Sequence, residues 1–138
     1  MSKTRTVSYW VLAVLLAFAF GAAGIMKLTA NPMEVAGFQM FGYALWFMYL
    51  IGALEVLGAI GVLLGKIVHR GLPRLAAYGL IGIMIGALYS HATHPPVLAG
   101  IPAVILTILL IIFIRTSKKI EHAALVPVIV PGETAHTV

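Results

Sequence analysis

Four long apolar stretches make up most of this chain, and they constrain its fold more than any other feature. They cover about residues 8–28, 43–65, 75–92 and 97–115. A helix rises about 1.5 Å per residue, so about 20 residues cross a hydrocarbon layer roughly 30 Å thick. Because 62% of the 138 residues are hydrophobic and only 9% are charged, a soluble core of this size could not hide them. We therefore predict an all-α, four-helix transmembrane bundle.

The basic residues predict how this bundle lies in the membrane. Eight of the nine fall at one end of the predicted bundle: Lys3, Arg5, Lys66, Arg70, Arg74, Arg115, Lys118 and Lys119. Cytoplasmic loops carry an excess of lysine and arginine, so we expect a multi-pass protein of a bacterial inner membrane with both termini in the cytoplasm. Because the basic residues follow this rule, we attribute the net charge of +5 to membrane topology and expect no nucleic-acid partner.

The first apolar stretch has a second interpretation as a secretory signal peptide, since Lys3 and Arg5 precede it. Its removal would leave three spans and would discard Gly21, Gly24 and Lys27, so we favour a retained helix. We expect one transmembrane domain over residues 1–119. A flexible cytoplasmic tail with several prolines would follow over residues 120–138.

Two connections carry signals of local structure. Asn31-Pro32-Met33-Glu34 reads as an N-cap, a proline in the first turn and an early acid, so we predict a short interfacial helix that ends at Gly42. Pro102 falls within the fourth stretch. We expect it to kink a full span there, and we prefer this to a re-entrant entry after the link 91–96.

Glu55 is the polar residue that most needs an explanation, because it lies roughly 18 Å along a helix of some 30 Å and therefore near the bilayer centre. A charged acid there costs about 3 kcal/mol on insertion scales, so its side chain should face the bundle interior. Lys27, Tyr89 and His91 end the first and third helices on the outer side, and His94 is a possible addition. We predict a polar pocket that binds a ligand or handles protons, although a structural hydrogen bond, an interfacial lysine and solvated histidines are the plainer alternatives.

Small residues recur at helix-packing spacing along the predicted spans, and such rows let two helix backbones approach closely. We expect plain packing within the bundle from six glycines: Gly21, Gly58, Gly61, Gly65, Gly82 and Gly86.

Several kinds of chemistry find no support in the sequence. There is no cysteine, so the chain has no disulfide, thiol redox couple or thiolate metal site. His91 and His94 stand three residues apart without an HExxH motif or clustered acids, so we predict no metal site. No catalytic motif is present, and we lean towards a chain that is not an enzyme by itself.

Three motifs resemble the DoxX-like (DoxX/DoxD-type) family of four-helix bacterial membrane proteins. Phe20 to Leu28 is similar to its F-x-x-x-G-x-x-K-L pattern, Gly52 to Gly58 to its G-x-x-E-x-x-G pattern, and Ala87 to His91 to its A-x-Y-x-H pattern. The resemblance implies a subunit tied to thiosulfate:quinone oxidoreduction, a partner in a membrane oxidoreductase complex, or an assembly factor. It also implies that Lys27, Glu55 and His91 belong to the site.

We therefore expect an accessory membrane protein whose pocket binds a quinone-like or other amphiphilic ligand and supports an oxidoreductase complex, with quinone as a possible cofactor. Its partners would be the lipid bilayer and another membrane protein or its own copies. The alternatives are an assembly factor without ligand chemistry and, ranked last, a proton-coupled carrier that acts as an oligomer.

Overall fold

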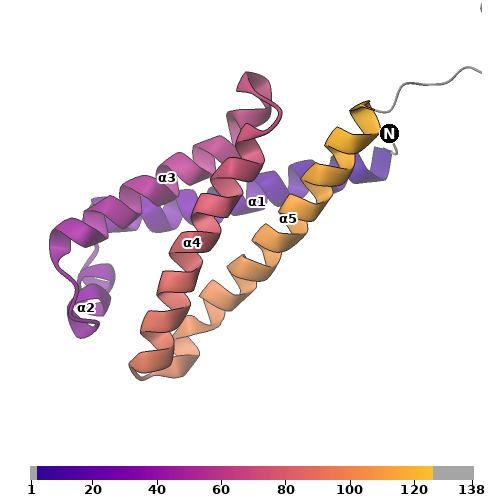
Figure 1. The fold of residues 1–138 in the computed structure, drawn as a ribbon. Coiled ribbons are helices and arrows are strands. Elements are labelled where there is room, and N and C mark those ends of the chain that lie inside the picture. The colour runs from indigo at the N-terminus through magenta and orange to yellow at the C-terminus, as the bar shows by residue number, and fades with distance from the viewer. Residues whose placement is uncertain (1–2, 126–138) are drawn as a thin grey trace, which may run out of the picture.

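The computed structural model describes residues 3–125, which form helices and no strands. The elements are α1 (Lys3–Leu28), α2 (Pro32–Met40), α3 (Leu45–Val68), α4 (Leu72–Thr93), the 3-10 turn η1 (Val97–Gly100) and α5 (Ile101–Leu125) (Figure 1). Four segments are long and apolar enough to cross a membrane: α1, α3, α4 and Val97–Ile120. The all-α prediction with four spans and a short helix between the first two is confirmed.

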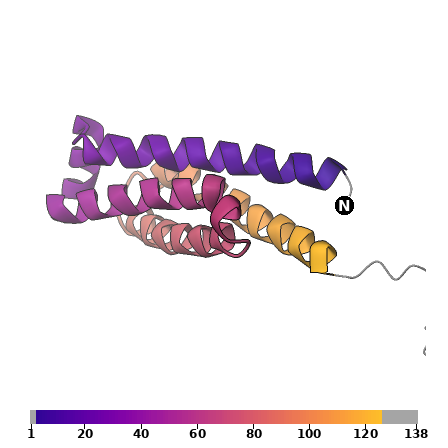
Figure 2. The ribbon, with the colours of Figure 1, turned by 90° about the horizontal axis from the view of Figure 1, so that it is seen from above.

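The four long helices close into a bundle in chain order. α1 packs most extensively along α3, which contacts α4; α4 contacts α5, and α5 returns to α1. Figure 2 shows α1 and α3 running side by side, with α4 next to α3 on the side away from α1. We call the end of the bundle that holds α2, the start of α3, the end of α4 and η1 the far end, because it lies opposite the first turn of α1 and the last turn of α5.

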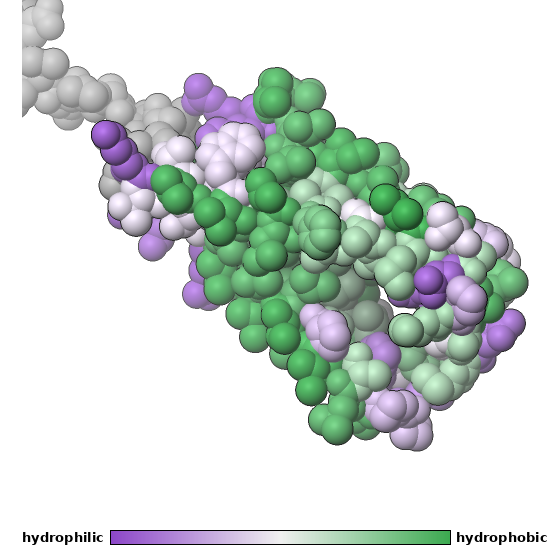
Figure 3. Space-filling model, turned by 180° about the vertical axis from the view of Figure 1, so that it is seen from behind, coloured by the Kyte–Doolittle hydropathy of each residue, from purple (hydrophilic) through white to green (hydrophobic). Residues whose placement is uncertain are grey.

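A narrow core lies between these helices, and most large apolar side chains face outwards. The fully buried side chains include Leu16, Phe20, Leu80, Leu110 and Phe113. Many others, such as Phe18 at 76% exposure, point away from the protein. Figure 3 shows this apolar surface over most of one face, with hydrophilic residues gathered towards its two ends. Such a surface is stable in lipid and not in water.

Two glycines bring α1 and α3 into close contact. A Cβ added to Gly24 would lie 2.7 Å from the Gly52 carbonyl oxygen, and one added to Gly52 would lie 2.8 Å from the Lys27 Cβ. Real Cβ atoms do not approach other atoms so closely, so both positions require glycine. Neither residue was among the six glycines assigned to packing, although both lie in the motifs of the first two spans.

The six predicted packing glycines divide into two groups. Gly58, Gly61 and Gly65 of α3 lie against α4, where an added Cβ would meet the helix within 2.5–3.0 Å, and Gly21 makes an ordinary contact of 3.9 Å. Gly82 and Gly86 of α4 have no atom within 4 Å of an added Cβ. For these two residues the expectation of packing within the bundle is wrong, because they lie on the face of α4 turned away from its neighbours.

The ends of α2 follow the predicted signals. The side chain of Asn31 accepts a hydrogen bond from the Met33 N–H at 3.0 Å, with Pro32 in the first turn. At the other end Gly42 adopts a left-handed φ of 75°, and the N–H of Tyr43 donates to the Phe38 carbonyl at 2.9 Å. This is the Schellman arrangement that favours glycine.

The expected kink at Pro102 is wrong, because the irregular part of the fourth span precedes it. η1 ends at Gly100 and α5 begins at Ile101, so Pro102 lies in the first turn of a helix, where its missing N–H leaves no bond unmade. α5 then continues past Arg115 to Leu125, which supplies a full span. The helix thus enters the region predicted as tail at residue 120, and residues 126–138 of that prediction lie outside the described residues.

Candidate functional site

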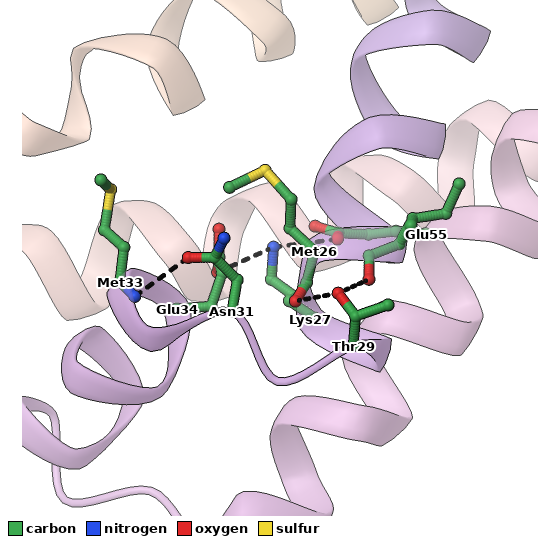
Figure 4. A network of polar contacts seen from close by, with 8 residues as sticks. Met26, Lys27, Thr29, Asn31, Met33, Glu34 and Glu55 are labelled. Atoms are coloured by element: carbon green, nitrogen blue, oxygen red, sulfur yellow. Dashed lines mark hydrogen bonds and ion pairs between the residues drawn. The ribbon is translucent and has the colours of Figure 1, made fainter.

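The ammonium group of Lys27 lies between two carboxylates at the far end of the bundle. Its Nζ is 3.0 Å from Oε2 of Glu55 and 3.3 Å from Oε2 of Glu34 (Figure 4). The side chains of Lys27 and Glu55 are only 11% and 3% exposed, and that of Glu34 is 23% exposed. We call these three residues the Lys27 cluster. They come from three different helices, so the cluster forms only in the folded bundle.

The glycine contact between α1 and α3 brings Lys27 to Glu55. Gly24 and Lys27 are three residues apart on α1, and Gly52 and Glu55 are three apart on α3, so each glycine shares a helix face with its charged neighbour. Where the two glycines touch, the stem of Lys27 lies directly over Gly52. The long side chain then needs only to continue along α3 to reach Glu55.

A tight reversal after α1 brings the third member, Glu34, back to the same place. The hydroxyl of Thr29 donates to the Ile25 carbonyl at 2.8 Å, and the N–H of Asn31 donates to the Met26 carbonyl at 2.9 Å. Ala30 between them adopts a left-handed φ of 51°, which costs an alanine about 1 kcal/mol. The Asn31 cap then starts α2 at once, so that Glu34 in its first turn faces Lys27.

The contact between Lys27 and Glu55 is an ion pair rather than a well-aligned hydrogen bond. Oε2 of Glu55 is buried and accepts no hydrogen bond of good geometry, although the ammonium nitrogen is only 3.0 Å away. A buried ion pair stabilises a fold only when further hydrogen bonds satisfy the remaining donors and acceptors. The Lys27 cluster is therefore held in place by the helices and retains unused hydrogen-bonding capacity.

The predicted pocket residues of α4 do not join this cluster. Tyr89 is 67% exposed, and the structure does not bring it to the Lys27 cluster. His91 is partly buried against Gly100 and meets the ring of Phe41 edge-on at 5.0 Å. Within residues 3–125 no polar contact joins His91 to Lys27 or Glu55. The structure thus separates the single predicted pocket into two polar groups.

The second group fastens the connection between α2 and α3 to the end of α4. Buried Ser90 donates to the Gly86 carbonyl at 2.9 Å, which leaves its oxygen to accept from the Tyr43 hydroxyl at 2.9 Å. Phe41 also lies against His94, with ring centroids 5.4 Å apart. Nδ1 of His94 in turn lies 3.2 Å from the Ser90 carbonyl oxygen. These contacts hold the connection that follows Glu34.

Sequence reasoning missed Glu34 and Ser90 as members of these groups. Glu34 was interpreted as an acid near a helix start and was not assigned to the pocket, although its place seven residues after Lys27, across a short turn, was available as a signal. Ser90 adjoins Tyr89, and the helix turns one of the two inwards and the other outwards. The sequence offered no signal that would choose between them.

The part of the chain that the structure describes was also compared with the ligand sets of metal sites. No three histidine, aspartate or glutamate side chains there lie close enough together to hold a metal ion. A shallow groove on α1 is lined entirely by apolar side chains: Trp10, Val11, Val14, Leu15 and Phe18. It lies along the first half of the helix, away from the Lys27 cluster, and has the character of a lipid-facing surface.

Comparison with known proteins covers this same bundle. The sequence profile of the DoxX-like family matches residues 11–114, which include the whole Lys27 cluster. A protein of Bacillus subtilis (strain 168) with the name Uncharacterized protein YdgD is 31% identical over 109 residues, which cover 78% of this chain and 95% of that protein. No solved structure matches the chain. The profile match, the relative that covers 78% of the chain and the four apolar spans agree, and the chain belongs to the DoxX-like family of membrane proteins.

Proposed function

We propose that this protein is a small accessory subunit of the membrane that binds the polar head of an amphiphilic ligand at the Lys27 cluster and supports a membrane oxidoreductase complex. One observation carries the proposal: three charged side chains from three helices meet in a site where two of them are almost fully buried. Charged residues within transmembrane segments are rare and costly, and they commonly mark ligand or ion pathways.

The far end also offers a way in for such a ligand. α2 has no buried residue, and its Glu34 is the most exposed member of the cluster. Figure 3 shows the bundle hollowed towards this end, with hydrophilic and apolar residues around the hollow. A head group could enter beside α2 while its apolar tail stays in the surrounding lipid.

The cluster has both donors and acceptors to offer a head group. An ammonium has three N–H donors. Lys27 forms ion pairs with Glu34 and Glu55, and its ammonium can also donate to the carbonyl of a quinone-like ligand. Since the chain has no cysteine, electron transfer would require the bound ligand or a partner protein. The role in an oxidoreductase complex is therefore one of holding or presenting a ligand.

The ligands retained on purification test this proposal. Wild type and the variants Lys27→Met, Glu55→Gln and Lys118→Met would be purified in a mild detergent and extracted, and their quinones and lipids measured by mass spectrometry. Lys118 is exposed, so Lys118→Met is the matched control for the loss of a lysine. We expect a ligand that is retained by wild type and the control and lost from both cluster variants. Equal retention by all four proteins would refute the site.

The orientation of the chain in an inner membrane is part of the proposal. Lys66 of α3 lies 4.9 Å above the ring of Tyr9 near the start of α1, which supports the gathering of basic residues at one end of the bundle. With that end in the cytoplasm, the Lys27 cluster would open to the opposite side. Single cysteines can be placed at Arg70 and at Gly37, because the chain has no cysteine of its own. A membrane-impermeant thiol reagent should label the cysteine at position 70 only in inside-out vesicles and the cysteine at position 37 only in right-side-out vesicles.

A second function, docking to another membrane protein, is favoured by the open face of α4. Gly79, Gly82 and Gly86 lie along it, and an added Cβ at any of them meets nothing within 4 Å. Bare glycines allow close approach of a further helix. Under this function Gly82→Ile would remove a co-purifying partner from native membranes, whereas Glu55→Gln would leave the partner bound.

A further inference from the structure

We propose that the head group taken by the Lys27 cluster carries a positive charge, as a protonated amine or a quaternary ammonium does. This inference rests on the proposed function and narrows it, because it selects cationic heads over the carbonyl head of a quinone. Two independent features of the far end point to the same chemistry: the charge balance of the cluster and a group of aromatic rings at the same end of the bundle.

The first feature is an uncompensated negative charge. Lys27 faces two carboxyl groups, with its Nζ within 3.3 Å of Oε2 of Glu34 and of Oε2 of Glu55, so the cluster carries one negative charge in excess when both acids are ionised. An unbalanced charge is costly in a buried site within an apolar bundle. A cationic head group cancels the excess charge. A neutral carbonyl head leaves it in place, and an anionic head doubles it.

The hydrogen-bonding groups of the cluster also favour a cationic head group, because acceptors outnumber donors there. Each carboxylate offers about four lone-pair sites, whereas the ammonium of Lys27 has three N–H donors in all. Glu55 is 2% exposed, and its Oε2 accepts no aligned hydrogen bond. The site therefore has acceptors to spare and few donors. A protonated amine supplies donors to those acceptors.

The second feature is a cluster of aromatic rings at the same end. Phe38, Tyr43 and Phe47 lie with their ring centroids 5.3–6.3 Å from one another. Phe38 follows Glu34 by four residues in α2, so the two side chains share one face of that helix. Aromatic faces attract ammonium groups, and aromatic rings are a common means of binding quaternary ammonium heads.

A thermal-stability assay with matched probes tests the inference on the full chain in a neutral maltoside detergent. The probes are dodecyltrimethylammonium, dodecyl sulfate and a decyl-substituted quinone, each below its micellar concentration. We expect dodecyltrimethylammonium to raise the unfolding temperature and to bind about tenfold more weakly to Glu34→Gln, which removes the most accessible carboxylate. Phe38→Ala should weaken its binding, whereas Phe18→Ala, on the exposed apolar face, should not.

The outcomes separate the inference from the function on which it rests. A shift by the quinone or the sulfate, but not by the ammonium probe, would overturn the cationic head and leave an amphiphile site standing. An equal ammonium shift in wild type, Glu34→Gln and Glu55→Gln would show binding outside the cluster and would also overturn it. If no probe shifts the unfolding temperature of wild type, the proposed function itself fails.

Two sources of such a head group are separated by a further arm of the same experiment. Native mass spectrometry would compare how much phosphatidylethanolamine and phosphatidylglycerol the protein retains from mixed vesicles. Tetramethylammonium, a cationic head group that lacks an alkyl tail, would be added as a probe in the thermal-stability assay. Preferential retention of phosphatidylethanolamine by wild type, but not by Glu34→Gln, indicates a membrane lipid. Binding of dodecyltrimethylammonium alone indicates a free amphiphilic amine.

Discussion

Replacing Gly52 by alanine should separate α1 from α3 and destabilise the protein. The new Cβ would lie 2.8 Å from the Lys27 Cβ and 2.9 Å from the Gly24 carbonyl oxygen. Neither atom is the end of a flexible side chain, so the two helices must move. Overpacking of this kind costs about 1–3 kcal/mol. Alanine also gains about 1 kcal/mol over glycine in a helix, which masks part of the loss.

Gly82→Ala is the matched control, because it adds the same methyl group to a helix position with no atom within 4 Å. The gain from helix preference is common to both variants, so their difference isolates the packing cost, about 1–3 kcal/mol in favour of Gly82→Ala. The assay is reversible unfolding in mixed micelles with increasing dodecyl sulfate, followed by circular dichroism. Equal free energies of unfolding for the two variants would refute the close contact between α1 and α3.

Three further predictions concern the far end. In double-mutant cycles on the free energy of unfolding, Lys27→Met should couple more strongly to Glu55→Gln than to Glu34→Gln, because the Glu55 side chain is 3% exposed and that of Glu34 is 23% exposed; removing one partner of a buried pair costs about 3–5 kcal/mol. Tyr43→Phe should lower the free energy of unfolding by about 1 kcal/mol through the lost hydrogen bond to α4, and an unchanged value would argue against that contact. Asn31→Ala should weaken α2 by about 1 kcal/mol, seen as faster hydrogen exchange confined to α2; exchange that rises equally in α5 would contradict a local cap.

The spans were predictable because their signal is carried by many residues at once, so no single side chain decides it. The caps of α2 were predictable for another reason: Asn31 and Gly42 act on backbone groups within a few residues of themselves. The start of α5 was not. Pro102 is compatible with both a kink and a first turn, and the choice depends on how η1 packs under His91.

In the candidate site, the sequence identified only the residues whose charge is energetically costly within an apolar helix. Glu55 stands out in an apolar helix, and its partner Lys27 is the one lysine or arginine outside the set that is expected to lie in the cytoplasm. Tyr89 and Ser90 are neighbours in sequence, and only the rotation of α4 decides that the serine faces Tyr43 while the tyrosine faces outwards. Helix rotation depends on packing with other helices, which one sequence read alone does not reveal.

The touching backbones at Gly24 and Gly52 have a consequence for affinity. Because they set the separation of α1 and α3 directly, the base of the Lys27 side chain is fixed by main-chain geometry rather than by a choice among rotamers. Under the proposed function, the site is therefore already arranged before a ligand binds, and little conformational entropy would be lost on binding. A substitution that loosens the contact between α1 and α3 should then weaken ligand binding even when every residue that contacts the ligand is unchanged.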